Sequence, residues 1–170
     1  DMSGTITIGG NAKVTAKSDG TAAGMGTGGE GEMSGTINID GNADVTATSN
    51  SGAGIGSGND SDVTKTGTIN IGGNAKVFAF SKYDGAGIGG GNEGNMNGTI
   101  NIRGNAKVIA ASGRKGAGIG AGAITEDENR NAQGGNMSGT ITIDGNATVN
   151  ASAGNKYGAG IGTGRVRTWR

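Results

Sequence analysis

The stretch GTINIDGNADVTATSNSGAGIGSG, residues 35–58, contains one complete copy of the unit from which this 170-residue chain is built. It joins three runs in a fixed order: Gly-Thr-Ile-Asn-Ile, Asn-Ala-x-Val-x-Ala and Ala-Gly-Ile-Gly. The third run also occurs at residues 23–28, 86–91, 117–122 and 159–164, with methionine in place of isoleucine in the first of these. The chain therefore consists of five copies of a three-part unit.

The first run begins at Gly4 and recurs after 31, 32, 31 and 41 residues, the last interval being lengthened by an insertion around residues 123–132. A period in this range marks a stacked repeat architecture. Apolar and polar residues alternate within the run and β-branched residues dominate, which predicts a strand with its isoleucines facing inward. The outer face then carries ten polar residues: Thr5, Thr7, Thr36, Asn38, Thr68, Asn70, Thr99, Asn101, Thr140 and Thr142.

The second run, residues 11–16 in the first copy, also alternates and is predicted to be a strand. Its Ala12, Val14 and Ala16 point inward, whereas Lys13 points outward. In the third run, alanine and isoleucine face inward and glycine faces outward. Glycine weakens a strand interior, so its repetition has two interpretations: a flat partner approaches the backbone, or the coil bends tightly there.

Three short strands per unit, with no helical periodicity, predict an all-β fold: a parallel β-solenoid, or β-helix, of about five coils of ~31 residues. One repeat buries too few aliphatic groups to offset its backbone entropy, so the copies are expected to fold only when stacked. We expect a single domain over residues 1–170, cut from a longer surface protein. The expected repeats are about 2–32, 33–64, 65–95, 96–135 and 136–164, and residues 165–170 form a tail or a partial cap through Trp169.

Two columns of equivalent residues are predicted to run along the stack. The first is an asparagine ladder at the corner after the first strand, in which each amide bonds to those above and below: Asn11, Asn42, Asn74, Asn105 and Asn146. The second column precedes the first strand and fills the core: Met2, Met33, Met96 and Met137, with Lys65 interrupting it. Both columns are interpreted as structural.

The composition excludes several functions. The 14 basic and 14 acidic residues cancel, which argues against a nucleic-acid partner. No apolar run is long enough for membrane insertion. The chain has no cysteine and no histidine, which removes thiolate metal sites and the commonest general base. The strands also lack the clustered carboxylates that polysaccharide-cleaving enzymes use, so we expect a protein that is not an enzyme.

The pattern GTITI or GTINI, GNAxVxA and GAGIGxG, which spans residues 4–164, resembles the glycine-rich repeats of large bacterial surface proteins, especially those of Gram-positive gut and soil organisms. This resemblance implies an extracellular parallel β-helix of adhesin or carbohydrate-binding type and implies no catalytic residues. We therefore expect a secreted or cell-surface module that serves as an adhesin or stalk. The expected partners are a glycan or a cell surface, together with other solenoid modules that stack by their faces or ends.

The outer Thr/Asn array of the first strands is the first candidate surface. Alternate residues of a strand lie ~6.7 Å apart and successive coils ~4.8 Å apart, which gives a flat, regular lattice. It resembles the Thr-x-Thr faces of β-solenoid ice-binding proteins, except that asparagine replaces the second threonine in the three middle copies. Ice binding (antifreeze activity) is therefore the alternative function, although threonine is also a good strand former on a solvent-facing surface.

Loops after the third strand concentrate acidic residues on one edge: Glu30, Glu32, Asp60, Asp62 and Glu93, then Glu126, Asp127 and Glu128. Ca²⁺ takes carboxylate and carbonyl oxygens from such loops, so one hypothesis is a calcium edge. No loop matches an EF-hand or a calcium-binding nonapeptide. The other hypothesis is a solvated edge that discourages lateral aggregation, and no cofactor is firmly predicted.

Loops between the second and third strands hold the glycan-binding candidates Tyr83, Tyr157, Lys82 and Asp84, accompanied by Arg114, Lys115 and Lys156. An aromatic ring beside polar side chains suits a sugar, because the ring stacks on the apolar face of a pyranose. Together with Phe78 and Phe80, the two tyrosines could instead cover a patch against a partner.

Overall fold

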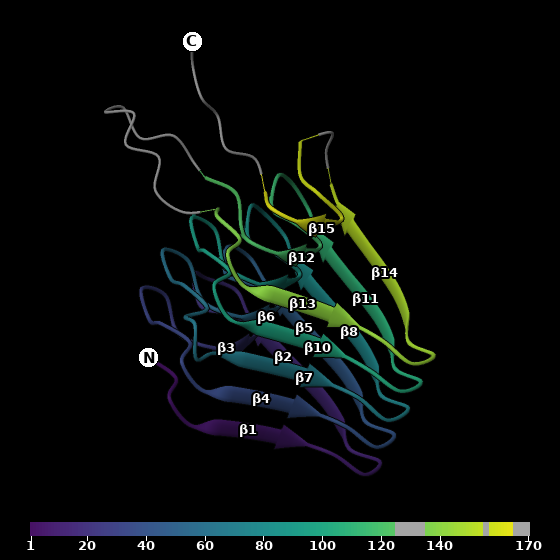
Figure 1. Cartoon of the computed structure of the whole chain (residues 1–170). Coiled ribbons are helices and arrows are strands. Elements are labelled where there is room, and N and C mark those ends of the chain that lie inside the picture. The colour runs from purple at the N-terminus through teal and green to yellow at the C-terminus, as the bar shows by residue number, and fades with distance from the viewer. Residues whose placement is uncertain (125–134, 155–156, 165–170) are drawn as a thin grey trace, which may run out of the picture.

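The computed structural model describes residues 1–124, 135–154 and 157–164. Within these ranges, fifteen strands form three five-stranded parallel sheets, and each sheet takes one strand from every coil. Figure 1 shows the strands of the first sheet, β1 to β13, stacked from the N-terminal to the C-terminal coil. The described part of the chain has no helix that is long and apolar enough to cross a membrane. The prediction of an all-β parallel solenoid with three strands per coil is confirmed.

The strands of one sheet share a length and a register. The first sheet consists of β1 (Thr5–Ile8), β4 (Thr36–Ile39), β7 (Thr68–Ile71), β10 (Thr99–Ile102) and β13 (Thr140–Ile143). The second consists of β2 (Lys13–Ser18), β5 (Asp44–Ser49), β8 (Lys76–Ser81), β11 (Lys107–Ser112) and β14 (Thr148–Ala153). The third consists of β3 (Met25–Gly26), β6 (Ile55–Gly56), β9 (Ile88–Gly89), β12 (Ile119–Gly120) and β15 (Ile161–Gly162).

Inward side chains of the three sheets form one continuous core. In the second coil Ile37, Val45, Ala47, Ala53 and Ile55 are each 0% exposed. The four of these that lie in strands have their equivalents directly opposite in the next coil, so isoleucine stacks on isoleucine and valine on valine. The predicted inward faces of all three runs are therefore confirmed, and stacking provides the burial that one coil lacks.

The second strand lies two residues later than the repeat pattern predicted. β2 begins at Lys13 and ends at Ser18, because Asn11 belongs to the preceding turn. The serine that ends this strand points inward and satisfies its hydroxyl on the backbone. In the second coil, for example, Ser49 is 3% exposed and its Oγ donates to the carbonyl oxygen of Ala22 at 2.7 Å. A hydrogen-bonded hydroxyl thus replaces an apolar residue at this inner corner.

In the third coil, the core column that precedes the first-sheet strand contains Val63, although Lys65 was predicted at this place. Parallel bridges join Met33 to Val63 and Val63 to Met96. Val63 is 0% exposed, whereas Lys65 lies on the surface. The prediction was wrong because Val63 precedes Gly67 by four positions. In the other coils the methionine precedes the corresponding glycine by two positions. The remaining methionines fill the column as predicted.

The glycines of the third run do not form an open face, which argues against one of their two interpretations, the approach of a flat partner to the backbone. Gly54 and Gly56 are both buried. A Cβ atom on Gly54 would meet the backbone nitrogen of Phe80 at 2.5 Å, and one on Gly56 would overlap the carbonyl oxygen of Gly89 in the next coil. The backbone that approaches these glycines closely therefore belongs to the solenoid itself, and the third strand offers no surface to a flat partner.

Replacing Gly56 by alanine is expected to destabilise the fold strongly. Gly56 has φ 135°, which a residue with a Cβ rarely adopts, and its Cβ would also overlap the next coil. We expect a loss of at least about 3 kcal/mol in the free energy of unfolding, measured by urea denaturation. The control is Gly9→Ala, since no heavy atom lies within 4 Å of a Cβ at Gly9. Equal denaturation midpoints for the two variants would contradict this account.

Candidate functional site

The outer face of the first sheet carries the predicted Thr/Asn array in register. Thr36 lies opposite Thr5, and the threonine column continues through all five coils. The amides of the middle coils bond to each other: Asn70 Nδ2 donates to Asn38 Oδ1 at 2.8 Å, and Asn101 Nδ2 donates to Asn70 Oδ1 at 2.9 Å. The structure therefore brings the ten predicted residues together, but it uses the amides to join neighbouring coils.

The predicted asparagine ladder at the corner is confirmed. Each Nδ2 donates to the Oδ1 of the preceding coil, at 3.0 Å from Asn42 to Asn11, 3.0 Å from Asn74 to Asn42 and 3.0 Å from Asn105 to Asn74. A fourth bond of 3.3 Å from Asn146 completes the ladder. Its role is structural, because these side chains are the hydrogen-bond partners of one another.

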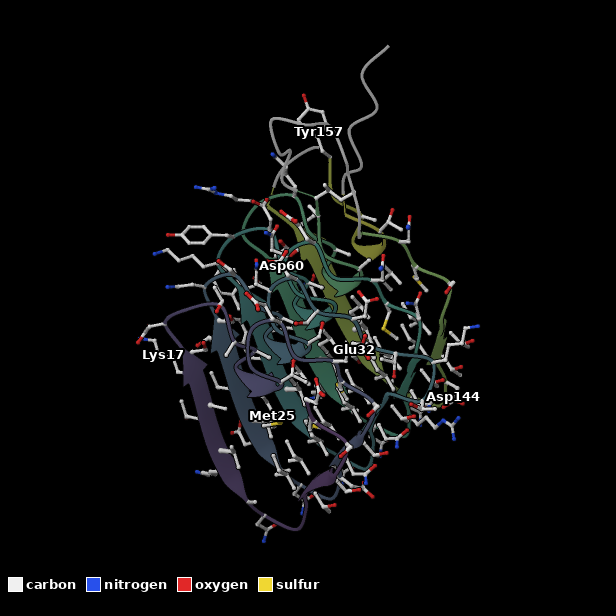
Figure 2. The ribbon with its side chains drawn as sticks, turned by 90° about the vertical axis from the view of Figure 1, so that its left-hand side faces the viewer. Lys17, Met25, Glu32, Asp60, Asp144 and Tyr157 are labelled. Atoms are coloured by element: carbon white, nitrogen blue, oxygen red, sulfur yellow. The ribbon has the colours of Figure 1, made fainter. Side chains whose placement is uncertain are left out.

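Acidic residues form a column on the edge that follows the third sheet. Glu30, Asp60 and Glu93 occupy one loop position in three successive coils, with φ values of 60°, 53° and 61°. With Glu32 and Asp62 they border a hollow of about 350 Å³. In Figure 2, Asp60 and Glu32 lie on the same side of the ribbon. The structure thus brings the five predicted acidic residues that it describes to one edge.

The geometry of this edge does not favour a metal ion. Asp62 accepts the backbone N–H of Asn95 on Oδ1 at 2.8 Å and the Nδ2 of the same residue on Oδ2 at 3.2 Å. Among the residues that the structure describes, no group of three or more histidine, cysteine, aspartate or glutamate side chains could hold a metal. The predicted acids 126–128 lie outside the described residues. Calcium binding stays a prediction.

The loops between the second and third sheets bring two cations close to the ring of Tyr83. The Nζ of Lys82 lies 5.2 Å from the centroid of the tyrosine ring, and the guanidinium carbon of Arg114 lies 4.7 Å from it. Both distances are in the range of cation–π contacts. Three of the predicted loop residues are therefore brought together.

Two other glycan candidates lie elsewhere. Asp84 is 5% exposed and its Oδ1 accepts the backbone N–H of Lys115 at 3.2 Å, so it is part of the packed loop and not of the surface. Tyr157 is 46% exposed. It precedes Gly158, which stacks on Gly116 and, through it, on Gly85, so Tyr157 aligns with Asp84 and the two tyrosines do not form one column. Lys156 lies outside the described residues.

An exposed apolar group that was only partly predicted lies on the outer face of the second sheet. Phe78 and Phe80 stack with ring centroids 6.3 Å apart. Ile109 lies directly opposite Phe78 in the next coil, and these two are 49% and 39% exposed respectively. The sequence signal for Ile109 was an isoleucine at an outward position of the alternating second run.

Known proteins support the architecture of the repeats. A family model described as "Beta helix repeat" matches residues 37–59, 100–123 and 141–165, together less than half of the chain. Each match begins within a first strand and ends beyond the third strand of the same coil. The fold and these matches define the class of the protein: it is a parallel β-solenoid whose repeats are similar to those of that family. No curated protein and no solved structure matches the chain.

Calcium is expected to leave the thermal stability unchanged. The described carboxylates are spread over successive coils, and Asp62 is already bonded to the chain. A ligand that binds the folded state raises its melting temperature by mass action. We therefore expect one melting midpoint, by circular dichroism, in calcium chloride and in excess chelator, with magnesium chloride as the control. A rise in the melting midpoint that is specific to calcium would support calcium binding at the acidic edge.

Proposed function

We propose that the chain is a non-enzymatic, extracellular repeat module that acts as a rigid adhesive spacer and contacts glycans or a cell surface through its flat outer faces. One observation carries this proposal. The polar columns are bonded from coil to coil along the stack, as in the corner ladder and the Asn38–Asn70–Asn101 ladder, so each column spans several coils. Such a structure presents long continuous surfaces.

The distribution of acidic residues supports a non-enzymatic role. Asp44 is the single acid within the fifteen strands that the structure describes. Glycoside cleavage by paired carboxylates requires two acids that flank one bond. Asp44 instead lies opposite Lys13 and Lys76 in the neighbouring coils. Its surroundings suit a charge that is balanced on a surface better than a catalytic pair.

A glycan array tests the adhesive part of the proposal. We expect the intact 170-residue chain, labelled at its N-terminus, to bind a subset of immobilised glycans. The matched control is the same chain after heat denaturation, because contact with a flat face requires stacked coils. An array without any binding by the native chain would reduce the protein to a spacer with no adhesive role.

Ice binding is the second candidate, and the unbroken threonine column Thr5–Thr36–Thr68–Thr99–Thr140 favours it. The Asn38–Asn70–Asn101 ladder weighs against it, because these amides already bond to each other. An ice-binding face also requires regular spacing, which the in-register pairing of the first sheet provides.

Thermal hysteresis separates the two candidates. If the threonine column binds ice, the native chain will lower the freezing point below the melting point, and Thr68→Tyr or Thr99→Tyr will abolish the effect by interrupting the flat face. Phe78→Thr, on the second sheet, is the control that should keep it. We expect no hysteresis in the native chain, and a hysteresis that disappears only in the Tyr variants would establish ice binding instead.

A further inference from the structure

The outer face of β8 and β11 and the loops that follow them carry a cluster of cationic, aromatic and aliphatic side chains, which we call the basic–aromatic patch. Its apolar centre is Phe78, Phe80 and Ile109, with two of the three at least 39% exposed. The same columns hold Thr46, Thr48 and Asn150 in other coils. Stacking of the coils therefore does not require apolar residues at these positions.

Cations border this apolar centre at both ends of the strands. At one end Lys76 and Lys107 lie directly opposite each other in neighbouring coils. At the other end Lys82 and Arg114 lie over the ring of Tyr83. Since residues rise ~3.3 Å along a strand, the two pairs of cations lie about 20 Å apart. A ligand that reaches both must therefore be extended.

The charge of the patch is only partly balanced within the described part of the chain: Asp44 lies directly opposite Lys76 in the preceding coil, but Lys107 has only Lys76 and Thr148 opposite it. The ion pairs found there join Lys17 to Asp19 and Arg103 to Asp144, and they include none of the patch cations. Like charges directly opposite each other in a sheet are destabilising, so the Lys76–Lys107 pair is a cost to folding. Asp84, the acid next to Tyr83 in the chain, is buried and points its Oδ1 at a backbone N–H. The patch is thus complementary to an anion.

We propose that the basic–aromatic patch binds a carboxylate-bearing polysaccharide, a polyuronate, which lies along β8 and β11. The carboxylates pair with the lysines and Arg114, while the apolar C–H faces of the sugars contact Phe78, Phe80 and Ile109. Burial of aromatic surface and charge pairing then act on one extended chain. This inference rests on the proposed adhesive function and names the class of glycan.

Nucleic acid is the competing polyanion, and the patch fits it less well. A protein that binds duplex DNA strongly through its backbone makes roughly six to ten phosphate contacts. The patch offers four cations, on a chain whose formal net charge is zero. An aliphatic residue at the centre, Ile109, packs against a sugar face but gives no aromatic stack for a base.

The first variant removes the apolar centre with residues that the same columns already contain: Phe78→Thr, Phe80→Thr and Ile109→Asn in one chain. The second removes charge: Lys76→Gln with Lys107→Gln. The control is Lys65→Gln, which removes a charge from an exposed lysine on another part of the surface. Because every apolar replacement occurs at the equivalent position of another coil, circular dichroism and melting should show a folded solenoid.

Binding is measured by isothermal titration of the intact chain with alginate oligomers in chelator, with dextran oligomers of equal length as the neutral probe and oligo(dT) as the nucleic acid. We expect binding to alginate that weakens with salt, and little or none to dextran or oligo(dT). Each patch variant should weaken binding at least about tenfold, and the lysine variant should also flatten the salt dependence. Lys65→Gln should stay within about twofold of the native chain.

Several outcomes overturn the proposal. Unchanged alginate affinity in both patch variants would place binding elsewhere, and equal binding of oligo(dT) would show a general polyanion surface. No binding to alginate, with neutral glycans bound on the array, would remove this inference and leave the proposed adhesive function standing. If the chain binds neither alginate nor any glycan on the array, both this inference and the proposed adhesive function are wrong.

Discussion

The close stacking of backbone on backbone in the third sheet is the constraint on which the rest of the solenoid depends. Gly56, Gly89 and Gly120 each have a positive φ, and a Cβ on any of them would overlap a carbonyl oxygen of the next coil. Ile55 and Ile88, which directly precede Gly56 and Gly89 in the chain, are fully buried. The outward positions of the third sheet are therefore glycines packed against the next coil, and this sheet has no outward side chains. A surface that binds through side chains is therefore expected on the outer faces of the first two sheets and on the loops.

Much of the fold follows from the period and the alternation of the sequence. An isoleucine at every second place predicts an inner face, and a fixed asparagine at each corner predicts a ladder, as the bond from Asn74 to Asn42 shows. The glycine wall was misjudged for a physical reason: a glycine has no side chain whose polarity could tell whether its position is buried. Lys65 was wrongly assigned to the core column because the loop before Gly67 has two additional residues. In the other coils the distance in sequence from the column residue to this glycine is constant.

The candidate surfaces were predicted less completely, because alternation tells which side a residue faces but not what it touches there. Asn38 and Asn70 were correctly placed outside, yet their mutual bond depends on a coil spacing that the sequence does not state. Asp84 lies in a loop rich in polar residues, and only the packed coils show that its carboxylate is turned inward to a backbone N–H. Ile109 joins Phe78 only through the register of two strands that are 31 residues apart in the chain.

A repeat protein offers an internal comparison that separates structure from function. A residue type that recurs in every coil, such as the corner asparagine, is explained by stacking, because each copy makes the same bond to the next. Phe78, Phe80 and Tyr83 occur in one coil alone, and the second coil holds Thr46 and Thr48 opposite the two phenylalanines in the same register. Exposed apolar side chains beside only partly balanced cations contribute little to the fold and add a cost in repulsion. Their presence is therefore better explained by the proposed ligand than by the architecture, and the proposed binding surface lies on the third and fourth coils.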